Sequence, residues 1–163
     1  MNINRFVLSF AIFLVASLGA CRTPPSTGST SVGTEAEIRS MLDRYFADFN
    51  DSRSEAIPDV WHVPGWVASG DRNLLLADND AVRSFYRAIL DTIEAEGYDH
   101  SDLLTADISF SNEACATIDF TFTRWNTDGE IMPPRVRPVS CVVLKNDGRW
   151  GINTLIFNTS SKI

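Results

Sequence analysis

The sequence is poor in the residue types that cofactor and metal chemistry requires. It contains two histidines and three cysteines, and none of their spacings matches the ligand patterns of a metal site. No glycine-rich phosphate loop precedes a helix, and no serine or cysteine stands on a nucleophile elbow. We therefore expect neither a metal nor another cofactor.

Positive charge is also scarce. The 14 Lys and Arg residues are outnumbered by 21 Asp and Glu residues, which gives a formal net charge of −7 at pH 7. Nucleic acid and anionic lipid surfaces are bound mainly through clustered cations. We therefore expect no nucleic-acid partner, and the acidic excess is read as a source of solubility.

The apolar run from Phe6 to Leu18 is shorter than the roughly 20 residues that a transmembrane helix needs. It follows Arg5 and ends at small residues, which predicts a secretory signal peptide over residues 1–20. The segment Leu18-Gly19-Ala20-Cys21 resembles the lipobox of bacterial lipoproteins. That resemblance implies a lipid anchor on Cys21 and a place in the bacterial cell envelope, facing the periplasm or the exterior. The alternative is an ordinary signal peptide that ends near a cysteine.

The segment after Cys21, RTPPSTGSTSVG, is rich in Pro, Ser, Thr and Gly and has no hydrophobic periodicity. Such a composition predicts a flexible tether. The expected organisation is a signal peptide (1–20), a lipidated cysteine with its linker (21–34), and one folded domain over residues 35–163. About 130 residues are enough for one domain with one core.

Three helices are predicted in the first half of this domain. The pair Thr34 and Glu37 forms a capping box that predicts a helix over residues 35–50. A short helix is predicted over residues 54–63, with Pro58 in its first turn. Asp78 or Asn79 caps the third predicted helix, which Gly97 ends. The first helix has an apolar stripe of Ile38, Met41, Leu42, Tyr45, Phe46 and Phe49, and the third one of Val82, Phe85, Tyr86, Ile89, Leu90 and Ile93.

The hydrophobic period changes to two in the second half of the chain, which predicts strands. Residues 103–110 and 114–125 are long strand candidates, and residues 66–68 and 73–76 are short ones. Residues 139–145 and 150–157 flank Asp147-Gly148, a strong hairpin signal that pairs Asn146 with Arg149. In the predicted pairing Cys141 lies opposite a residue near Phe122, roughly 20 Å from Cys115. That distance exceeds disulfide reach, so two free and mostly buried thiols are expected.

This order of elements resembles the nuclear transport factor 2-like (SnoaL-like, ketosteroid isomerase-like, cystatin-like) α+β domain. The segments that carry the resemblance are 38–50, 81–86, 112–125 and 146–157. It implies a cone-like curved antiparallel sheet wrapped around a long N-terminal helix, with two further helices and a blind pocket. The expected ligand-binding residues of that pocket are Phe49, Trp61, Trp66, Ile118, Phe120, Phe122, Ser140, Val142, Asn153 and Leu155.

The same resemblance argues against steroid isomerisation. The isomerases of this fold use a tyrosine, a carboxylate base and a second acid, and the matching positions here are Tyr45, Ser69 and Ser140. Without a base and a second acid, proton abstraction from carbon and stabilisation of the enolate are both unsupported.

Other chemistry-bearing side chains each allow two interpretations. Asp59 and His62 are spaced to share one face of the predicted short helix, either as an acid/base pair or as a solvated surface. Trp61 and Trp66 either clamp a flat apolar ligand or belong to the core. Arg137, with Arg135 beside it, either attracts an anionic ligand or belongs to a charged loop. His100, Asp99 and Asp102 are read as a surface loop.

Three hypotheses of function remain open. The first is a lipoprotein that binds a small apolar molecule without catalysis, favoured because the catalytic set is incomplete. The second is a cofactor-free hydratase, isomerase or cyclase that uses Tyr45, Asp59 and His62 as catalytic residues. The third is an assembly module that forms a homodimer through the outer face of the sheet. The side chains expected on that face are Thr117, Asp119, Thr121, Thr123 and Trp125.

Overall fold

The computed structural model describes residues 28–70 and 72–158, with side chains described from Thr34 onward. The predicted signal peptide and the predicted lipidation site Cys21 lie outside the described residues. Within the described part of the chain, no helix is long and apolar enough to cross a membrane. The elements are α1 (Gly28–Asn50), η1 (Ile57–Val60), β1 (Trp61–Ser69), β2 (Arg72–Leu76), α2 (Asn79–Ala95), β3 (Tyr98–Asn112), β4 (Cys115–Asn126), β5 (Arg137–Asn146) and β6 (Arg149–Phe157).

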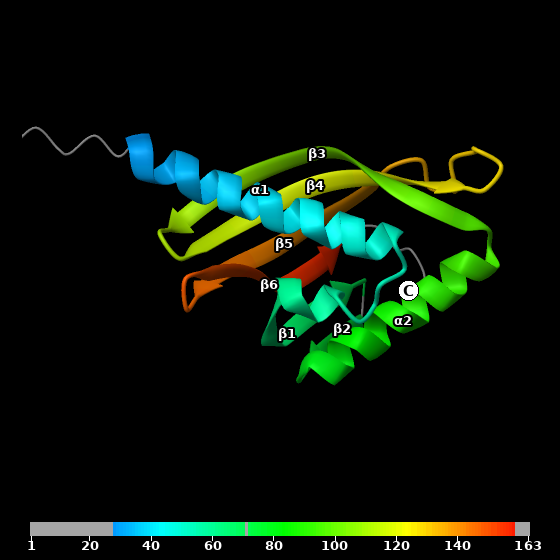
Figure 1. Ribbon diagram of the computed structural model, residues 1–163, viewed down its shortest axis with the longest axis horizontal. Coiled ribbons are helices and arrows are strands. Elements are labelled where there is room, and N and C mark those ends of the chain that lie inside the picture. Colours follow the sequence, from blue (N-terminus) through cyan, green and yellow to red (C-terminus); the bar gives the residue numbers. More distant parts are fainter. Residues whose placement is uncertain (1–27, 71, 159–163) are drawn as a thin grey trace, which may run out of the picture.

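A curved sheet of six strands, in the order β2-β1-β6-β5-β4-β3, forms one layer of the α+β fold (Figure 1). Most neighbouring strands are antiparallel, but β1 runs parallel to β6. The sheet is therefore mixed, and the expectation of a purely antiparallel sheet is wrong. The chain between β1 and β6 contains the rest of the sheet and α2, so no hairpin turn dictates their relative direction.

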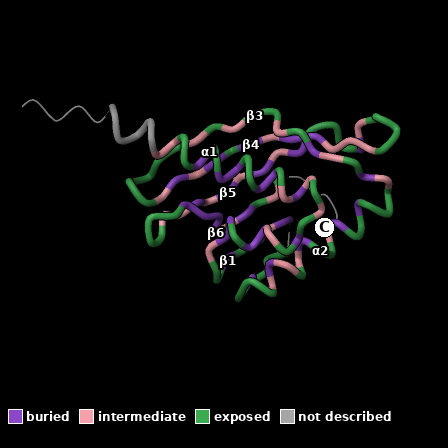
Figure 2. The backbone as a smooth tube through the Cα atoms, in the orientation of Figure 1, coloured by how far each residue is buried: buried purple, intermediate pink, exposed green. Residues whose placement is uncertain are grey.

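Helix α1 lies across one face of the sheet, which we call the inner face (Figure 1). The whole predicted stripe of α1 is buried, with exposed fractions of 0% at Ile38 to 8% at Tyr45 and Phe46. It packs on the apolar positions of β4, such as Ile118 and Phe120, and Figure 2 shows buried stretches of backbone in both α1 and β4. The helix begins at Gly28, so Thr34 lies inside it and is not the N-cap that the capping box predicts.

The second predicted helix is wrong, because only two α-helices are present in the described residues. Residues 57–60 form a single 3₁₀ turn, and Trp61 already has the extended φ of −105° and ψ of 155°. Trp61 then pairs with Ile152 of β6, so β1 begins where the helix was expected to continue. Ile57, Val60 and Trp61 are nevertheless buried, since the turn directs the same side chains into the core.

Helix α2 begins and ends as predicted. The Asp78 carboxylate accepts a hydrogen bond of 2.9 Å from the Ala81 amide, which caps the first turn. Gly97 follows the helix with a φ of 85°, a conformation that glycine adopts without strain. The stripe of α2 divides into two parts: Val82, Tyr86, Leu90 and Ile93 are buried, whereas Phe85 and Ile89 are only partly covered.

The predicted strand at residues 114–125 is confirmed as β4, and the Asp147-Gly148 hairpin is confirmed by the pairing of Asn146 with Arg149. The faces assigned to β5 are wrong. Asp119 pairs with Ser140, and Thr117 pairs with Val142. Ser140 and Val142 therefore lie on the outer face of the sheet, beside polar positions of β4 and away from Ile118.

A register shift between β5 and β6 explains why Leu155 does face inward. Val143 pairs with Ile152 and Val142 with Thr154, so Asn153 is the extra residue of a bulge. After the bulge, each side chain of β6 faces the side of the sheet opposite to the one that simple alternation from Ile152 would give. Leu155 is consequently buried with an exposed fraction of 1%, while Asn153 is displaced from the ladder.

Both cysteines of the domain are free thiols, as predicted. Cys141 is buried and Cys115 is partly buried. The register behind the prediction is wrong, because Cys141 lies opposite Ile118, and Cys115 lies opposite Leu144. Side chains alternate between the two faces along a strand, so Cys115 and Ile118 lie on opposite faces of the sheet. Cys141 is paired with Ile118 and shares its face, so the two thiols lie on opposite faces.

The outer face of β4 is polar, as the alternation predicts. The Thr105 and Thr121 hydroxyls share a hydrogen bond of 2.8 Å, and the Ser140 hydroxyl donates to the Asp119 carboxylate. Thr123 is buried with an exposed fraction of 3%. Formation of a homodimer through this face stays a prediction.

Candidate functional site

A cavity of about 1000 Å³ lies between α2, the β1–β2 hairpin and the inner face of the sheet. Ala81, Ser84 and Ala88 contribute small side chains from α2. Their spacing of three and four residues places them on one face of the helix. Small side chains on this face leave open space beside the helix.

The opposite walls of the cavity are mainly hydrocarbon. The β1–β2 hairpin contributes Val67 and Leu74 to Leu76, and the main sheet contributes Phe122, Pro138 and Phe157. Phe85, Ile89 and Ile93 complete the apolar lining from α2. Phe85 and Ile89 are the part of the α2 stripe that the core covers only partly. A mainly apolar concave site of this size is typical of small-molecule binding.

Arg124 lies at the inner end of the cavity and brings a positive charge into it. Its guanidinium carbon lies 5.6 Å from the centre of the Phe49 ring and 5.5 Å from that of the Phe122 ring. Burial lowers the pKa of Arg124, while nearby Tyr45, Tyr98 and Glu96 act in the opposite direction. The Nε atom of Arg124 is buried and has no hydrogen-bond partner among the residues that the structure describes.

Arg137 lines the same cavity but is firmly held. Its guanidinium donates hydrogen bonds of 2.7 Å to the Pro134 carbonyl and 2.8 Å to the Pro133 carbonyl. Burial, and to a lesser extent the charge of Arg124, lowers the pKa of Arg137 to about 10, against the attraction of Glu96. The two arginines are therefore close enough to repel each other.

The polar side chains that line the cavity are positively charged or uncharged. Its polar lining consists of Arg72, Arg124 and Arg137 with Ser69, Asn73, Ser84 and Thr92. No carboxylate, imidazole, phenol or thiol lines it in the part of the chain that the structure describes. The same part of the chain contains no group of His, Cys, Asp and Glu residues able to hold a metal ion.

A second, smaller cavity of about 20 Å³ continues from this inner end toward the core. It shares Ile89, Phe122, Arg124 and Phe157 with the larger cavity and is bounded on its far side by Tyr45 and Tyr86. The space is sufficient for about one water molecule. Tyr45 therefore lies behind the larger cavity, separated from it by Phe122 and Arg124.

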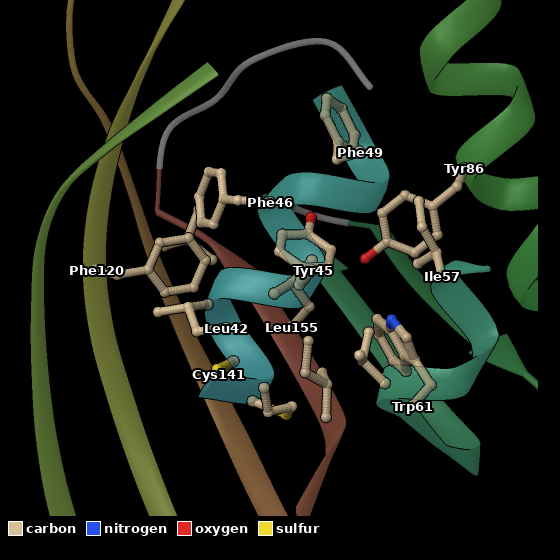
Figure 3. Packing of buried hydrophobic residues seen from close by; sticks show 14 of the residues in the cluster. Leu42, Tyr45, Phe46, Phe49, Ile57, Trp61, Tyr86, Phe120, Cys141 and Leu155 are labelled. Atoms are coloured by element: carbon tan, nitrogen blue, oxygen red, sulfur yellow. The ribbon is translucent and has the colours of Figure 1, made fainter. Parts of the chain in front are cut away.

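The polar groups around Tyr45 are enclosed by the core. Figure 3 shows the Tyr86 hydroxyl directed toward Tyr45, whose ring centre is 5.8 Å from that of Tyr86. In the described residues, the Tyr86 hydroxyl and the Trp61 indole nitrogen lie near polar neighbours but outside the geometry of a full hydrogen bond. Burial raises the pKa of Tyr45 to about 12, although the Tyr86 hydroxyl partly offsets this. Tyr45 is thus a neutral core phenol at ordinary pH.

The predicted catalytic residues are not brought together. His62 lies at the start of β1, where its ring nitrogens lie 3.1 Å from the Arg149 carbonyl and 3.1 Å from the Arg149 guanidinium. The Arg149 guanidinium also donates a hydrogen bond of 2.7 Å to the Asp59 carbonyl. No hydrogen bond or ion pair joins the Asp59 carboxylate to His62 in the described residues. Tyr45, Asp59 and His62 all lie outside the lining of the larger cavity.

The predicted pocket residues are scattered over four environments. Phe122 lines both cavities, and Phe49 lines the smaller one. Trp66, 48% exposed, is paired with Leu75 outside both cavities, and Asn153 donates a hydrogen bond of 3.1 Å to the Pro64 carbonyl. The remaining predicted residues lie in the core (Trp61, Ile118, Phe120 and Leu155) or on the outer face (Ser140 and Val142).

Two features of the sequence could have identified the actual lining. Arg124 continues the alternation of Phe120 and Phe122, which directs it to the inner face. The small residues Ala81, Ser84 and Ala88 recur on one face of a predicted helix. Arg137 was recognised in the sequence as a candidate for an anionic ligand, and it does line the cavity. His100, by contrast, lies in an exposed cluster with Asp99.

The family of the domain follows from sequence comparison. The family described as NTF2-like protein (DUF6841) matches residues 35–157, which is most of the chain. The chain belongs to this family. No curated protein matches the sequence significantly.

Solved structures of this fold confirm the NTF2-like architecture. An NTF2-like protein with a cystatin-like fold from Novosphingobium aromaticivorans is 16% identical, with a TM-score of 0.65 over 80% of this chain and 86% of that chain. A protein of unknown function from Nostoc punctiforme is 17% identical, with a TM-score of 0.61 over 76% of this chain and 88% of that chain. A protein from Novosphingobium aromaticivorans that is provisionally described as a scytalone dehydratase is 14% identical, with a TM-score of 0.61 over 82% of this chain and 91% of that chain. At these identities the similarity shows the fold alone.

Proposed function

We propose that this NTF2-like domain binds a small, mainly apolar molecule in the cavity between α2 and the sheet and does not transform it. The observation that carries the proposal is the lining of the cavity, which consists of hydrocarbon, arginine and a few uncharged hydroxyl and amide side chains. General acid/base catalysis needs a side chain that exchanges a proton near neutral pH within reach of the ligand. The described lining supplies shape and positive charge, which favour binding over proton transfer.

The alternative function is that of a hydratase, isomerase or cyclase. The structural neighbour described as a scytalone dehydratase is the reason to consider it. In this chain the supporting residues are Tyr45, Asp59 and His62. Their separation in space and the raised pKa of Tyr45 favour the binding function instead.

We also propose that the domain is anchored to a membrane of the bacterial envelope through a lipid on Cys21. The support is the lipobox-like sequence before Cys21 and the tether-like composition after it. Metabolic labelling with a palmitate analogue tests this proposal. Label should be incorporated into the full-length chain and lost in Cys21→Ser, and label retained by Cys21→Ser would contradict the anchor.

The binding proposal is tested with N-phenyl-1-naphthylamine, an uncharged dye whose fluorescence rises in apolar surroundings. Ala88→Trp places an indole in the cavity, and Ala47→Trp places one on the exposed side of α1 as a matched control. Binding should be saturable with the unmodified protein and with Ala47→Trp, and about ten-fold weaker with Ala88→Trp. Absence of binding, or equal binding by all three proteins, would overturn the proposal.

A further inference from the structure

We infer that the ligand of this cavity is an amphipathic carboxylate, whose anionic group is bound by the Arg124 guanidinium. The inference rests on the proposed binding function and adds the chemical class of the ligand. The apolar walls would hold the hydrocarbon body, and Arg124 at the inner end would hold the charge.

The first support is that the Arg124 guanidinium has no polar partner. In the described residues it makes no hydrogen bond and no ion pair, and its Nε atom is fully enclosed. The side chain of Arg124 is partly buried, and an uncompensated charge in such surroundings is costly, so such groups are normally paired. Arg137, a buried arginine of the same lining, follows that rule, since its guanidinium donates hydrogen bonds to two proline carbonyls.

The second support is the way in which Arg124 is held. Phe49 and Phe122 contact the guanidinium through cation–π interactions. These contacts fix the position of the side chain but use none of its five N–H donors. A fork of free donors at the end of an apolar cavity fits the two oxygens of a carboxylate.

The third support is the electrostatic environment. Arg137 adds a second positive charge that is anchored by two proline carbonyls. Glu96 attracts both arginines from outside the lining, and no acid lines the cavity itself in the described residues. The chain as a whole carries a net charge of −7, so this positive, apolar cavity stands out from the remainder of the molecule. An anion would relieve the repulsion between the two arginines.

The test compares dodecanoate with dodecan-1-ol, which differ in the charged group and share one alkyl chain. Each compound is used to displace N-phenyl-1-naphthylamine at pH 8, where the carboxylate is ionised. Both are kept below the concentration at which dodecanoate forms micelles. We expect dodecanoate to bind at least about ten-fold more tightly than dodecan-1-ol. A hydrogen bond between the guanidinium and a carboxylate is stronger than one between the guanidinium and a neutral hydroxyl.

Variants assign this preference to one residue. Arg124→Met should bring the two affinities to within about three-fold of each other. Arg87→Met removes an exposed arginine of α2 that lies outside the cavity lining and should keep the full preference. A thermal melt of each variant confirms that it is folded.

The outcomes separate this inference from the proposed function. One outcome is that the dye binds but dodecanoate and dodecan-1-ol bind equally to the unmodified protein. The inference then fails and the binding function stands. That comparison uses the unmodified protein alone. A preference that survives in folded Arg124→Met also overturns the inference, because Arg124 would then be a purely structural partner of Phe49 and Phe122. If the dye does not bind at all, the proposed function fails first.

Discussion

At the scale of single residues, Arg124 and Arg137 show how one residue type serves two roles. Both line the cavity, and burial lowers the pKa of both. Arg137 donates to the carbonyls of Pro133 and Pro134, so it stabilises the loop between β4 and β5. Within the described residues the Arg124 guanidinium has aromatic contacts but no hydrogen bond or ion pair, so its charge is a cost to the unliganded domain.

This contrast predicts opposite effects on stability. Arg137→Met removes two hydrogen bonds made by a charged group and should lower the free energy of unfolding by about 1–3 kcal/mol. Arg124→Met should leave the free energy of unfolding unchanged or raise it, because it replaces an unpartnered cation by an apolar side chain. Urea denaturation without ligand measures both. A greater loss of stability for Arg124→Met than for Arg137→Met would contradict this account of the cavity.

At the scale of elements, β1 determines where the cavity lies. It pairs antiparallel with β2 and parallel with β6, and so carries the hairpin that forms one wall. Gly65 allows this strand to pass close to β6. A Cβ atom at Gly65 would lie 2.8 Å from the backbone carbonyl oxygen of Asn153 and 3.0 Å from the Trp61 ring.

Gly65→Ala should therefore destabilise the domain. The clash involves backbone at the bulge of β6, which cannot move as freely as a side chain, and we expect a loss of about 1–3 kcal/mol. Ser109→Ala, an exposed position on β3, is the control and should change stability by less than about 0.5 kcal/mol. Equal unfolding midpoints for the two variants in urea would show that β1 and β6 are less closely packed than described.

At the scale of the whole molecule, every tyrosine of the sequence belongs to the buried interior. The three tyrosines are Tyr45, Tyr86 and Tyr98, with exposed fractions of 8%, 0% and 7%. Burial is the main reason that the pKa of Tyr45 and of Tyr98 rises to about 12 and that the pKa of Tyr86 lies well above its usual value. The ionisation of these phenols is thus coupled to unfolding of the domain.

The sign of this coupling follows from the raised pKa values. Between about pH 10 and pH 12 the folded chain keeps phenolic protons that the unfolded chain has released. The stability contributed by neutral tyrosines is complete below about pH 10 and is lost as the pH rises toward 12. The lowered pKa of Arg137 acts in the opposite sense over the same range.

Absorbance at 295 nm reports the phenolate form directly. We expect little phenolate in the native protein at pH 10, and a cooperative rise near pH 12 that coincides with loss of the circular dichroism signal. The chain in concentrated urea is the control and should titrate near pH 10. A native protein that shows half of its phenolate absorbance at pH 10 would contradict the buried placement of these rings.

Much of the fold follows from local patterns that the sequence contains in full. The stripe of α1, the cap of α2 at Asp78, the alternation of β4 and the hairpin at Asp147-Gly148 each depend on neighbouring residues. Helical and strand periodicity and turn chemistry are local properties, so these predictions are confirmed by the structure.

The cavity depends instead on contacts between distant segments. A bulge at Asn153, the register that pairs Ile118 with Cys141, and the parallel contact of β1 with β6 decide which side chains face inward. A change of one residue in register exchanges the two faces of a strand, which is why Ser140 and Val142 were assigned to the wrong face. The sequence by itself determined the two long helices, the strand β4, the Asp147-Gly148 hairpin and the family resemblance. Only the tertiary structure placed Arg124 without a partner at the end of an apolar cavity, because burial and pairing arise from packing between elements that no local pattern encodes.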